Sequence, residues 1–507
     1  MIELFKKPLF VFEMANNHQG NVEHGKRIIR EIKKVVKEFE NIFDFAFKFQ
    51  YRDLDTFIHP DYKNDFSYKY IKRFSETKLS ESQFLELKDE LEKNEFITMC
   101  TPFDENSVKK VIKHNYDIIK VASASFTDWP LLEEISKYDK PIIASTAGAT
   151  LNEIRNVIYF FKHRGRNINI MHCVAAYPTT DEKLELNQID LLKNEFPDIN
   201  VGFSTHEKPD NFDAIKIAIA KGATIFEKHV GVETDKIKLN AYSANPEQVY
   251  KWLKSAKKAY IMSGVRGKRY SFSKEELTSL KNLRRGIFAL KNISKGQCIT
   301  MNEVFFAIPR QNGQYASNDM SKYKKFVAKK DIKAYEPISE NNVEIKDLYP
   351  QIKEYVREIL DIVRKSNVVI PENSVCELSH HYGLDNFKNF GAAIIDIINR
   401  EYCKKIIILL PGQKHPEHYH KQKEETFNVL YGDFIINIDG QERVYKPGDI
   451  IIVERNKKHS FYSETGAVIE EISTTHFKND SFYSDKKIQS NKHRKTQIYL
   501  TEDILSY

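Results

Sequence analysis

The chain has 507 residues, of which 41% are hydrophobic and 29% are charged, and its formal net charge is +7. At roughly 100–200 residues per domain this length predicts two to four domains, and the hydrophobic content excludes a disordered chain. The 78 basic and 71 acidic residues are spread along the sequence, so the positive surplus is too diffuse to predict a nucleic-acid partner.

Cysteine usage and the N-terminus predict a cellular compartment. The five cysteines form an odd number without a close pair, which indicates reduced, intracellular thiols. The first residues lack the apolar stretch of a signal peptide, and no run reaches the roughly 18 apolar residues that cross a bilayer. We expect a soluble, cytoplasmic protein without membrane contact. We interpret the charge run at 486–495 as a solvated tail rather than a binding patch.

Short apolar runs of strand length recur through the first half of the chain, each followed by a segment with helical spacing. Strands buried on both faces lack polar alternation, and eight strand–helix alternations predict a TIM (β/α)8 barrel. The predicted strands are 9–14, 45–50, 96–100, 117–121, 141–145, 168–173, 200–204 and 224–229, with amphipathic helices at 22–39, 81–93, 105–114, 151–162 and 211–220.

A smaller segment follows and repeats itself. Residues 293–304 match residues 332–343, with Ile, Ile, Asn and Val at equal offsets. Two copies predict a compact, pseudo-symmetric module of about 70 residues, too short for a solenoid, which needs three or more units.

The last part of the chain is rich in predicted strands. An amphipathic helix over 351–365 precedes apolar runs that are separated by Gly, Pro and Asp turns. This pattern predicts an all-β domain, a small barrel or a jelly roll. The predicted strands are 406–410, 426–431, 434–438, 449–453 and 468–472.

Polar residues gather where the barrel strands end, which is where TIM barrels carry their catalytic groups. Lysines and hydroxyls at these ends suit a phosphate or a carboxylate, because lysine supplies charge and Ser or Thr supplies hydrogen bonds. His206 and His229 end adjacent predicted strands, which indicates either a divalent-metal site or two ordinary hydrogen-bonded histidines. The candidate residues are Glu13, Lys48, Thr101, Lys120, Ser123, Ser145, Tyr177, Ser204, His206 and His229.

These strand ends carry a family resemblance. In order they read Phe12-Glu-Met-Ala-Asn-Asn-His-Gln-Gly20, Lys48-Phe-Gln50, Thr101-Pro-Phe103, Lys120-Val-Ala-Ser123, Ser145-Thr146, His172-Cys173, Tyr177-Pro178, Gly202-Phe-Ser-Thr-His206 and Glu227-Lys-His229. The series resembles the sialic acid synthase (N-acetylneuraminate synthase) family. The match extends over about 9–349, because the repeated module is similar to the family's C-terminal antifreeze-like (SAF) domain, an α+β or β-clip fold.

The resemblance implies a reaction and partners. Such enzymes condense phosphoenolpyruvate with an aldose to give a 3-deoxy-2-ulosonic acid and phosphate, here for a surface polysaccharide. They use a divalent metal, usually Mn²⁺, and they form homodimers in which each SAF domain covers the partner's barrel. By analogy, the residues that hold phosphoenolpyruvate are Lys48, Thr101, Lys120, Ser123, Ser145 and Ser204. The metal is bound by His206 and His229. Glu13 orients the acceptor or handles its proton, and Tyr177 lines the acceptor pocket.

The departures from the family pattern lie on the acceptor side. Ser125 replaces an acceptor-binding Glu, Ala175 replaces an Asn, residues 236–243 replace a loop with an acceptor-binding Asp, and Ile308 replaces an Arg. We therefore expect an acceptor other than N-acetylmannosamine. Two arginines follow the second predicted strand, Arg52 and Arg73. We interpret them either as groups that bind an anionic or more hydroxylated acceptor or as surface ion-pair partners.

A second candidate metal site lies in the C-terminal domain. His418 and His420 share one side of a predicted strand, Glu425 follows, and His459 ends a later strand. The spacing resembles the cupin signature, and the surrounding sequence resembles the cupin sugar isomerases that act on D-lyxose. We expect a divalent metal, Mn, Zn, Fe or Ni; the alternative is a relic barrel whose histidines only form hydrogen bonds. The domain is interpreted as a sugar isomerase or a sugar sensor.

The sequence thus predicts three domains. They are a TIM barrel at 1–268, an SAF domain at 279–349 and a cupin at 350–507 that begins with a helical linker. Two other interpretations stay open at this point. One is a TIM-barrel pyruvate aldolase or lyase with a Schiff-base lysine, and the other is a non-catalytic carbohydrate-binding protein.

Overall fold

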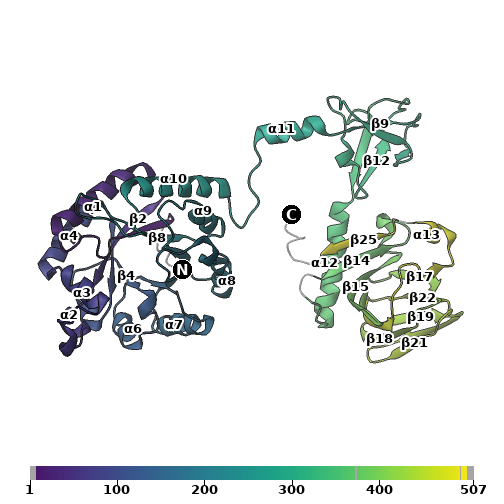
Figure 1. Ribbon diagram of the computed structural model, residues 1–507. Helices are drawn as coiled ribbons and strands as arrows, with labels where there is room; N and C mark the ends of the chain where they lie inside the picture. The colour runs from purple at the N-terminus through teal and green to yellow at the C-terminus, as the bar shows by residue number, and fades with distance from the viewer. Residues whose placement is uncertain (1–6, 372–373, 492, 500–507) are drawn as a thin grey trace. The chain divides into compact units, whose positions relative to one another are not determined.

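The computed structural model describes residues 7–371, 374–491 and 493–499. The chain divides into two compact units, Met1–Ser271 and Phe272–Tyr507 (Figure 1). None of the helices in these ranges combines the length and the apolarity that a membrane crossing requires.

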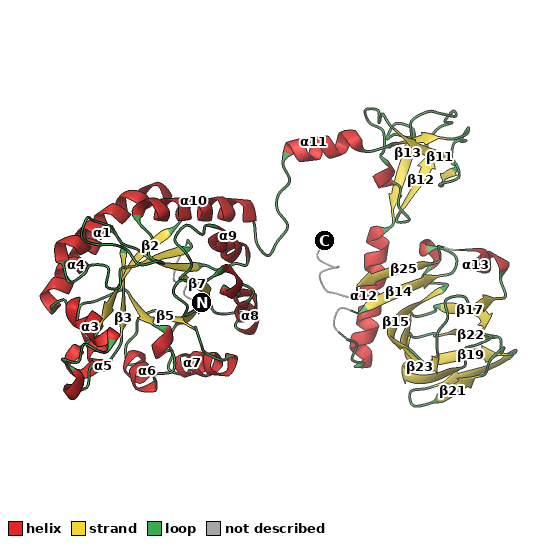
Figure 2. Ribbon diagram, viewed as in Figure 1, coloured by secondary structure: helices red, strands yellow, loops and turns green. Residues whose placement is uncertain are grey.

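The first unit is a closed barrel of eight parallel strands in chain order, β1 to β8. All eight strands predicted from the sequence are confirmed, with ends that differ by at most two residues. Figure 2 shows the ring of helices around the strands. The strands are β1 Leu9–Glu13, β2 Asp44–Tyr51, β3 Ile97–Pro102, β4 Ile118–Val121, β5 Ile142–Ser145, β6 Ile168–Cys173, β7 Val201–Thr205 and β8 Ile225–His229.

The helices of this unit cover the barrel and begin at side-chain caps. Thr150 and Ser80, for example, each form a capping box with the third residue of the following helix. The short helices α2 and α3 form an insertion between β2 and β3. The helices are α1 Val22–Val36, α2 Leu54–Phe57, α3 Lys69–Glu76, α4 Glu81–Lys93, α5 Glu105–Lys113, α6 Trp129–Ser136, α7 Leu151–His163, α8 Gln188–Glu195, α9 Asp213–Ala220 and α10 Pro246–Ser263.

The inside of the barrel changes from apolar to polar along the strands. A cluster that includes Val11, Ala46 and Ile225 fills its lower part. Because alternate strand residues share a face, the inward residues two positions later are Glu13, Lys48 and Glu227. The apolar layer therefore closes the barrel from below and leaves the polar groups at the end where the strands terminate.

The second unit begins with helix α11 (Lys274–Leu283) and a small β module. In the module the two sequence repeats meet, because Ile293 and Ile332 form a β-bridge. The equivalent residues Ile299 and Ile338 are buried in the same core. The strands are β9 Gly286–Ala289, β10 Cys298–Ile299, β11 Val304–Ala307, β12 Lys324–Ala328 and β13 Val343–Asp347.

After helix α12 (Tyr349–Ser366), the C-terminal domain consists of one seven-stranded and one five-stranded sheet, with an apolar core that includes Phe427, Phe434 and Ile469. This two-sheet arrangement is the jelly-roll form of the predicted all-β domain. The strands are β14 Val375–His380, β15 Gly391–Asn399, β16 Tyr402–Leu409, β17 Lys414–Tyr419, β18 Glu425–Tyr431, β19 Phe434–Ile438, β20 Gln441–Tyr445, β21 Ile450–Val453, β22 His459–Tyr462, β23 Ala467–Thr474, β24 Phe482–Tyr483 and β25 Lys495–Tyr499.

The interpretation of 486–495 as a solvated tail was wrong. The first five residues of the run form helix α13 (Lys486–Ser490). Strand β25 begins at the last residue of the run, Lys495, and pairs with β14. Thr496 is fully buried, and its hydroxyl contacts His380 Nε2 at 3.0 Å. Within the run, Ile488 of α13 is buried.

A buried ion pair ties the last two barrel strands together. Lys228 Nζ lies 2.8 Å from Glu207 Oε1, and neither residue is more than 1% exposed. Lys228 immediately precedes His229, and Glu207 immediately follows His206. The pair therefore links the backbone at the ends of β7 and β8, which carry the two histidines.

We expect Lys228→Met to lower the free energy of unfolding of the barrel by about 3–5 kcal/mol, because it leaves the Glu207 carboxylate buried without a counter-charge. Urea denaturation followed by tryptophan fluorescence measures this in the full chain. Both tryptophans, Trp129 and Trp252, lie in the barrel unit.

The matched control is Lys216→Met, which removes an exposed partner of Asp213 on α9. Surface pairs of this kind contribute roughly 0–1 kcal/mol. Equal effects of the two variants would contradict a structural role for the buried pair.

Candidate active site and metal centre

A polar cavity of about 470 Å³ opens where the barrel strands end. Its wall contains the predicted residues Glu13, Arg52, Arg73, Lys48, Lys120, Ser123, Ser145, Tyr177, Ser204, His206 and His229. Thr101 is buried but does not belong to this wall, so its role stays a prediction. The strand order thus brings together side chains that are up to 216 positions apart in the sequence, from Glu13 to His229.

Lys48 occupies the floor of this cavity between two carboxylates. Its Nζ lies 2.6 Å from Glu13 Oε2 and 2.9 Å from Glu227 Oε2. Burial by itself lowers the pKa of Lys48, but the two carboxylates more than reverse this effect and hold the pKa above its usual value. Lys48 is therefore a fixed cation at the base of the site.

Lys120 is the second buried lysine. Its Nζ donates to Ser145 Oγ at 2.6 Å and to the carbonyl oxygen of Val121 at 3.1 Å. Burial lowers the pKa of Lys120 to about 8, although the nearby Glu227 opposes that shift. Its charge therefore depends on pH within the range in which enzymes are assayed, unlike that of Lys48.

Hydroxyl groups surround these lysines. Ser204 Oγ donates to Glu227 Oε1 at 3.0 Å, and Ser123 Oγ accepts from the backbone N–H of Ala147 at 3.2 Å. Two lysines and three serines facing one cavity form a set of donors suited to a ligand with several anionic oxygens.

His206 and His229 lie side by side at the mouth, with ring centroids 5.3 Å apart. His206 donates Nδ1–H to the carbonyl oxygen of Val174 at 3.1 Å, which leaves its Nε2 with a lone pair. Burial lowers the pKa of His206 to about 4 and that of His229 well below its usual value. Both rings are thus neutral, as metal ligands must be, and they fit a divalent ion with open positions.

The sequence gave no role to several residues of this wall, among them Glu227, Tyr242 and Asn240. Glu227 pairs with Lys48, and Tyr242 places its ring 5.0 Å from that of His229 and 5.9 Å from that of His206. Asn240 comes from the same loop, 236–243, that departs from the family pattern. The Glu227-Lys-His229 motif contained a signal for Glu227, whereas nothing local distinguished Tyr242.

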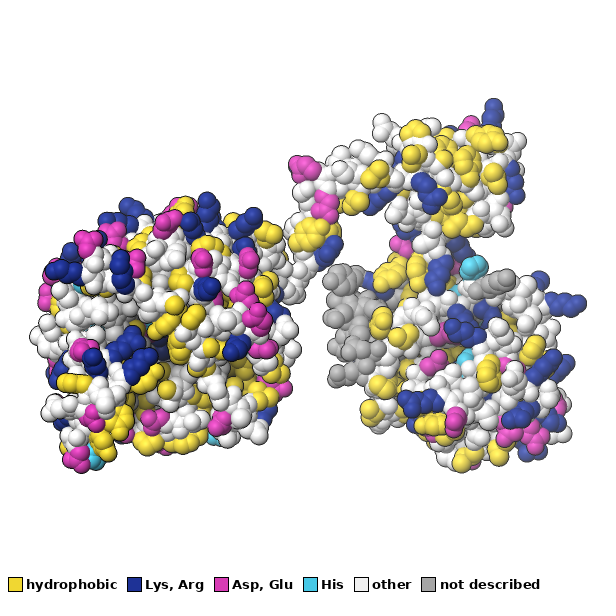
Figure 3. All heavy atoms as spheres, viewed as in Figure 1, with side chains coloured by type: hydrophobic (Ala, Val, Ile, Leu, Met, Phe, Trp, Pro, Cys, Tyr) yellow, Lys and Arg dark blue, Asp and Glu magenta, His cyan; other side chains and the backbone are white. Residues whose placement is uncertain are grey.

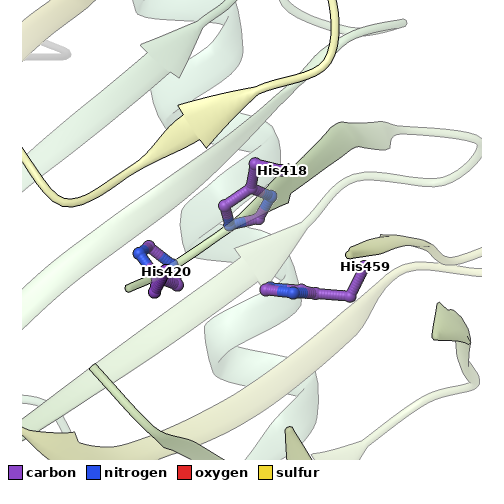
Figure 4. Close-up of side chains that lie close together, drawn as sticks. All are labelled: His418, His420 and His459. Atoms are coloured by element: carbon purple, nitrogen blue, oxygen red, sulfur yellow. The ribbon is translucent and has the colours of Figure 1, made fainter. Parts of the chain in front are cut away.

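The second site lies in the C-terminal domain, where His418, His420 and His459 bring ligand nitrogens within 4.8 Å of one another (Figure 4). Each ring donates its Nδ1–H to a backbone carbonyl, so all three turn Nε2 toward the centre. The acceptors are Pro416 at 3.1 Å, Asp480 at 2.6 Å and Lys457 at 3.1 Å, respectively.

Glu425 completes this arrangement. Its Oε2 lies 3.1 Å from His459 Nε2, and its Oε1 lies 3.4 Å from His420 Nε2. Because the Nδ1 atoms carry the protons, acceptor lone pairs face each other across these contacts. A cation removes this repulsion, so the donor set fits a divalent metal. The four residues lie together, and their role as metal ligands stays a prediction.

Several neighbours of this second site were not predicted. Lys423, which is 4% exposed, pairs with Glu425 and with Glu471 at 2.8 Å. Tyr483 stacks on His418, and Arg494 donates to the Tyr483 hydroxyl at 3.1 Å. Arg494 belongs to the run 486–495 that was interpreted as a solvated tail, and Tyr483 lies three residues before that run.

Comparisons with known proteins agree with this geometry. The NeuB family model matches residues 43–268. A crystal structure from Chromobacterium violaceum, of a protein that bears the name spore coat polysaccharide biosynthesis protein E, is 49% identical. It covers 67% of this chain and 100% of that chain with a TM-score of 0.65. An uncharacterised protein of Methanocaldococcus jannaschii is 31% identical over 60% of this chain and 86% of its own length.

The chain belongs to the NeuB family. An N-acetylneuraminate-9-phosphate synthase of Drosophila melanogaster is 24% identical over 66% of this chain and 95% of its own length. NeuB-family synthases condense phosphoenolpyruvate with a sugar, so the barrel is that of a carbon–carbon bond-forming synthase. Membership decides against the Schiff-base aldolase and the non-catalytic interpretations.

This NeuB-family chain also carries a cupin domain, matched over residues 405–472. The matched range contains His418, His420, Glu425 and His459. The resemblance of the C-terminal domain to cupins is therefore confirmed.

We expect His459→Ala to lower the divalent-metal content of the full-length NeuB-family protein by about one ion per chain. The variant keeps two imidazoles and the Glu425 carboxylate, which also pairs with Lys423. These groups bind a metal more weakly than the intact set of donors. Metal analysis of the purified protein after dialysis measures this.

The exposed His163 on α7 provides the control, because His163→Ala should leave the metal content unchanged. A His459→Ala protein that retains the full metal content would contradict the assignment of this centre.

Proposed function

We propose that the barrel joins C3 of phosphoenolpyruvate to the aldehyde carbon of an aldose other than N-acetylmannosamine. Water adds at C2 of the donor, the C2–O bond to phosphate breaks, and the aldehyde oxygen gains a proton. The products are a 3-deoxy-2-ulosonic acid and inorganic phosphate. The observation that carries this proposal is the cavity in which Lys48, Lys120 and the neutral pair His206 and His229 face one another.

The donor site is assigned to the lysines and serines. Lys120 and Ser145 are already in contact, so a phosphate or carboxylate oxygen that replaces this bond finds both donors in place. Ser123 and Ser204 add hydroxyl donors, and Lys48 holds its charge at all assay pH values. Thr101 stays in the proposed set on the resemblance alone.

His206 and His229 are the proposed ligands of a divalent metal, Mn²⁺ by resemblance. When bound, such an ion supplies Lewis-acid polarisation of the acceptor's aldehyde oxygen. The protein's own groups orient the acceptor: Tyr177, with its ring 4.4 Å from that of His206, lines the mouth. Glu13 Oε1 accepts from the backbone N–H of Ala15 at 2.6 Å, which holds the carboxylate where it can receive or deliver the acceptor's proton.

The experiment that tests the synthase assignment incubates full-length protein with Mn²⁺, phosphoenolpyruvate and a panel of aldoses, and follows phosphate release. Release should require both a competent aldose and the metal, and His229→Ala should lower the rate by at least about 100-fold. An EDTA-treated protein that keeps its full rate would contradict the metal assignment.

We predict that kcat/KM for phosphoenolpyruvate falls as pH rises through about 8. Lys120 carries its charge below its pKa of about 8 and loses it above, so the attraction for the anionic donor weakens at higher pH. A pH profile of initial rates at low donor concentration measures this.

The variant Lys120→Arg keeps its charge at higher pH and should remove the fall, even though its different shape lowers the rate. A wild-type profile that stays flat to pH 9.5 would show that Lys120 does not carry the charge that binds the donor.

N-acetylmannosamine should be a poor acceptor. The structure places Ser125 and Ala175 outside the cavity wall, and the departing loop contributes Asn240 and Tyr242 instead of an acidic residue. Each lost polar partner shifts acceptor preference by about 1–3 kcal/mol. In the aldose panel, the highest kcat/KM for N-acetylmannosamine would contradict this prediction.

Relatives support a variable acceptor. They include an N,N'-diacetyllegionaminic acid synthase and a pseudaminic acid synthase of Campylobacter jejuni, whose names specify different products. Two relatives are named for spore coat polysaccharide biosynthesis, which supports a product destined for a surface polysaccharide.

The second unit is proposed to serve the barrel. The cupin centre suits a metal-dependent aldose isomerase, in which a carboxylate near Glu425, such as Glu471 of the same pocket, moves the proton. Glu470, which the sequence also suggested for this role, does not line the pocket and pairs with Lys404 at 2.7 Å. The other interpretation is a sugar sensor. Incubation with single aldoses and analysis for ketoses separates the two. The small module, as an SAF domain, is proposed to cover the barrel of the second subunit of a homodimer, which light scattering tests.

A further inference from the structure

We propose that the acceptor sugar carries an anionic group, a phosphate or a carboxylate, that Arg52 and Arg73 bind at the rim of the barrel cavity. This inference rests on the proposed function, because it specifies the acceptor of that same reaction. It is carried by the way in which Arg52 is held and by the lack, among the described residues, of a carboxylate within ion-pairing distance of either arginine.

Arg52 is held by packing rather than by an ion pair. Its guanidinium carbon lies 3.7 Å from the ring centroid of Phe103 and 4.1 Å from that of Phe74, so two aromatic rings fix the group. Arg52 Nη2 donates to Gln50 Oε1 at 2.9 Å, while the buried Nε has no hydrogen-bond partner. Arg52 lines the cavity without an ion pair to any described residue, and a guanidinium in that position is suited to bind an oxyanion.

Arg73 and Lys69 bring two more positive charges to the same rim. Both line the cavity from α3, one turn apart. In the part of the chain that the structure describes, neither residue nor Arg52 has a carboxylate within ion-pairing distance. Figure 3 shows Lys and Arg side chains gathered at the hollow in the middle of the barrel.

The carboxylates of the cavity wall form their ion pairs with Lys48 and not with the rim. The only acidic residues in the described wall are Glu13 and Glu227, and both hold Lys48. Ser204 additionally donates to Glu227. The rim thus remains positive beside a floor that is balanced by its own ion pairs.

The position of the rim favours the acceptor over the donor. Arg52 follows the end of β2, and Lys69 and Arg73 lie on α3, which comes after β2 in the chain. The proposed donor groups Lys120, Ser145 and Ser204 end strands β4, β5 and β7, whereas the rim cations follow β2. A sugar with its aldehyde between His206 and His229 would direct its far end toward the opening of the cavity.

The test compares matched pairs of acceptors with the full-length protein, Mn²⁺ and phosphoenolpyruvate, and it follows consumption of phosphoenolpyruvate. The pairs are D-arabinose with its 5-phosphate, D-mannose with its 6-phosphate and with D-mannuronate, and N-acetylmannosamine with its 6-phosphate. For at least one pair we expect the anionic member to have a kcat/KM about 10- to 100-fold higher than its neutral partner. The mannose series distinguishes phosphate from carboxylate.

Neutral members that react as well as the anionic ones in every pair would overturn the inference and leave the synthase assignment intact. If no sugar causes consumption of phosphoenolpyruvate, the proposed function itself fails, and this inference fails with it.

Two variants connect the preference to the rim. Arg52→Gln and Arg73→Gln should each raise KM for the anionic acceptor about 10-fold or more and leave KM for phosphoenolpyruvate within about twofold. The control is Lys72→Gln, which removes an exposed charge from the same helix but does not touch the cavity. If loss of the Arg52 stack disturbs folding of Arg52→Gln, the Arg73→Gln variant still tests the rim.

A larger rise in KM for phosphoenolpyruvate than for the acceptor would assign the rim to the donor and overturn the inference. Recovery of acceptor KM in Arg52→Lys would confirm that charge matters there, because lysine keeps the charge without the planar stack.

Discussion

The salt-bridged lysine at the floor of the barrel is the constraint on which the rest of the active site depends. Three charges are buried together there, and such charges are tolerated only where each finds a partner of opposite sign. Lys48 is the partner of opposite charge for both Glu13 and Glu227. Because these residues come from β2, β1 and β8, which are neighbours only in a closed barrel, the charge network exists only when the barrel is closed. Closure therefore assembles the site and compensates its charges in one step.

The same network explains why the two buried lysines differ. Lys48 keeps its proton because two carboxylates adjoin it. Lys120 contacts a hydroxyl and a carbonyl, and burial lowers its pKa to about 8. A site that holds one permanent and one adjustable cation can bind a multiply charged donor and still release an inorganic phosphate. The positive rim lies outside this balanced floor, so a second anion finds a separate place.

The cupin centre follows a related rule with different groups. Backbone carbonyls fix the tautomers of His418, His420 and His459 so that lone pairs converge. One of these carbonyls belongs to Asp480, whose carboxylate also accepts from the backbone N–H groups of residues 421–423. Asp480 therefore both orients the ring of His420 and holds the turn at residues 421–423.

The sequence by itself determined the number and order of the barrel strands, the two sequence repeats and the residue types at every strand end. These features follow local rules: apolar runs of strand length, helical spacing, and inward positions at every second residue. It also indicated the proposed cupin ligands, because the spacing of His418, His420, Glu425 and His459 resembles the cupin signature. Only the tertiary structure decided which of these groups are paired. Residues from separate elements meet in the ion pairs of Lys48, in the approach of Tyr242 to His206 and His229, and in the contact of Lys423 with Glu425. The lack of an ion pair between Arg52 and any described residue likewise depends on what the rest of the fold places around it. Charge compensation and exposure depend on such long-range contacts, and no local pattern encodes them.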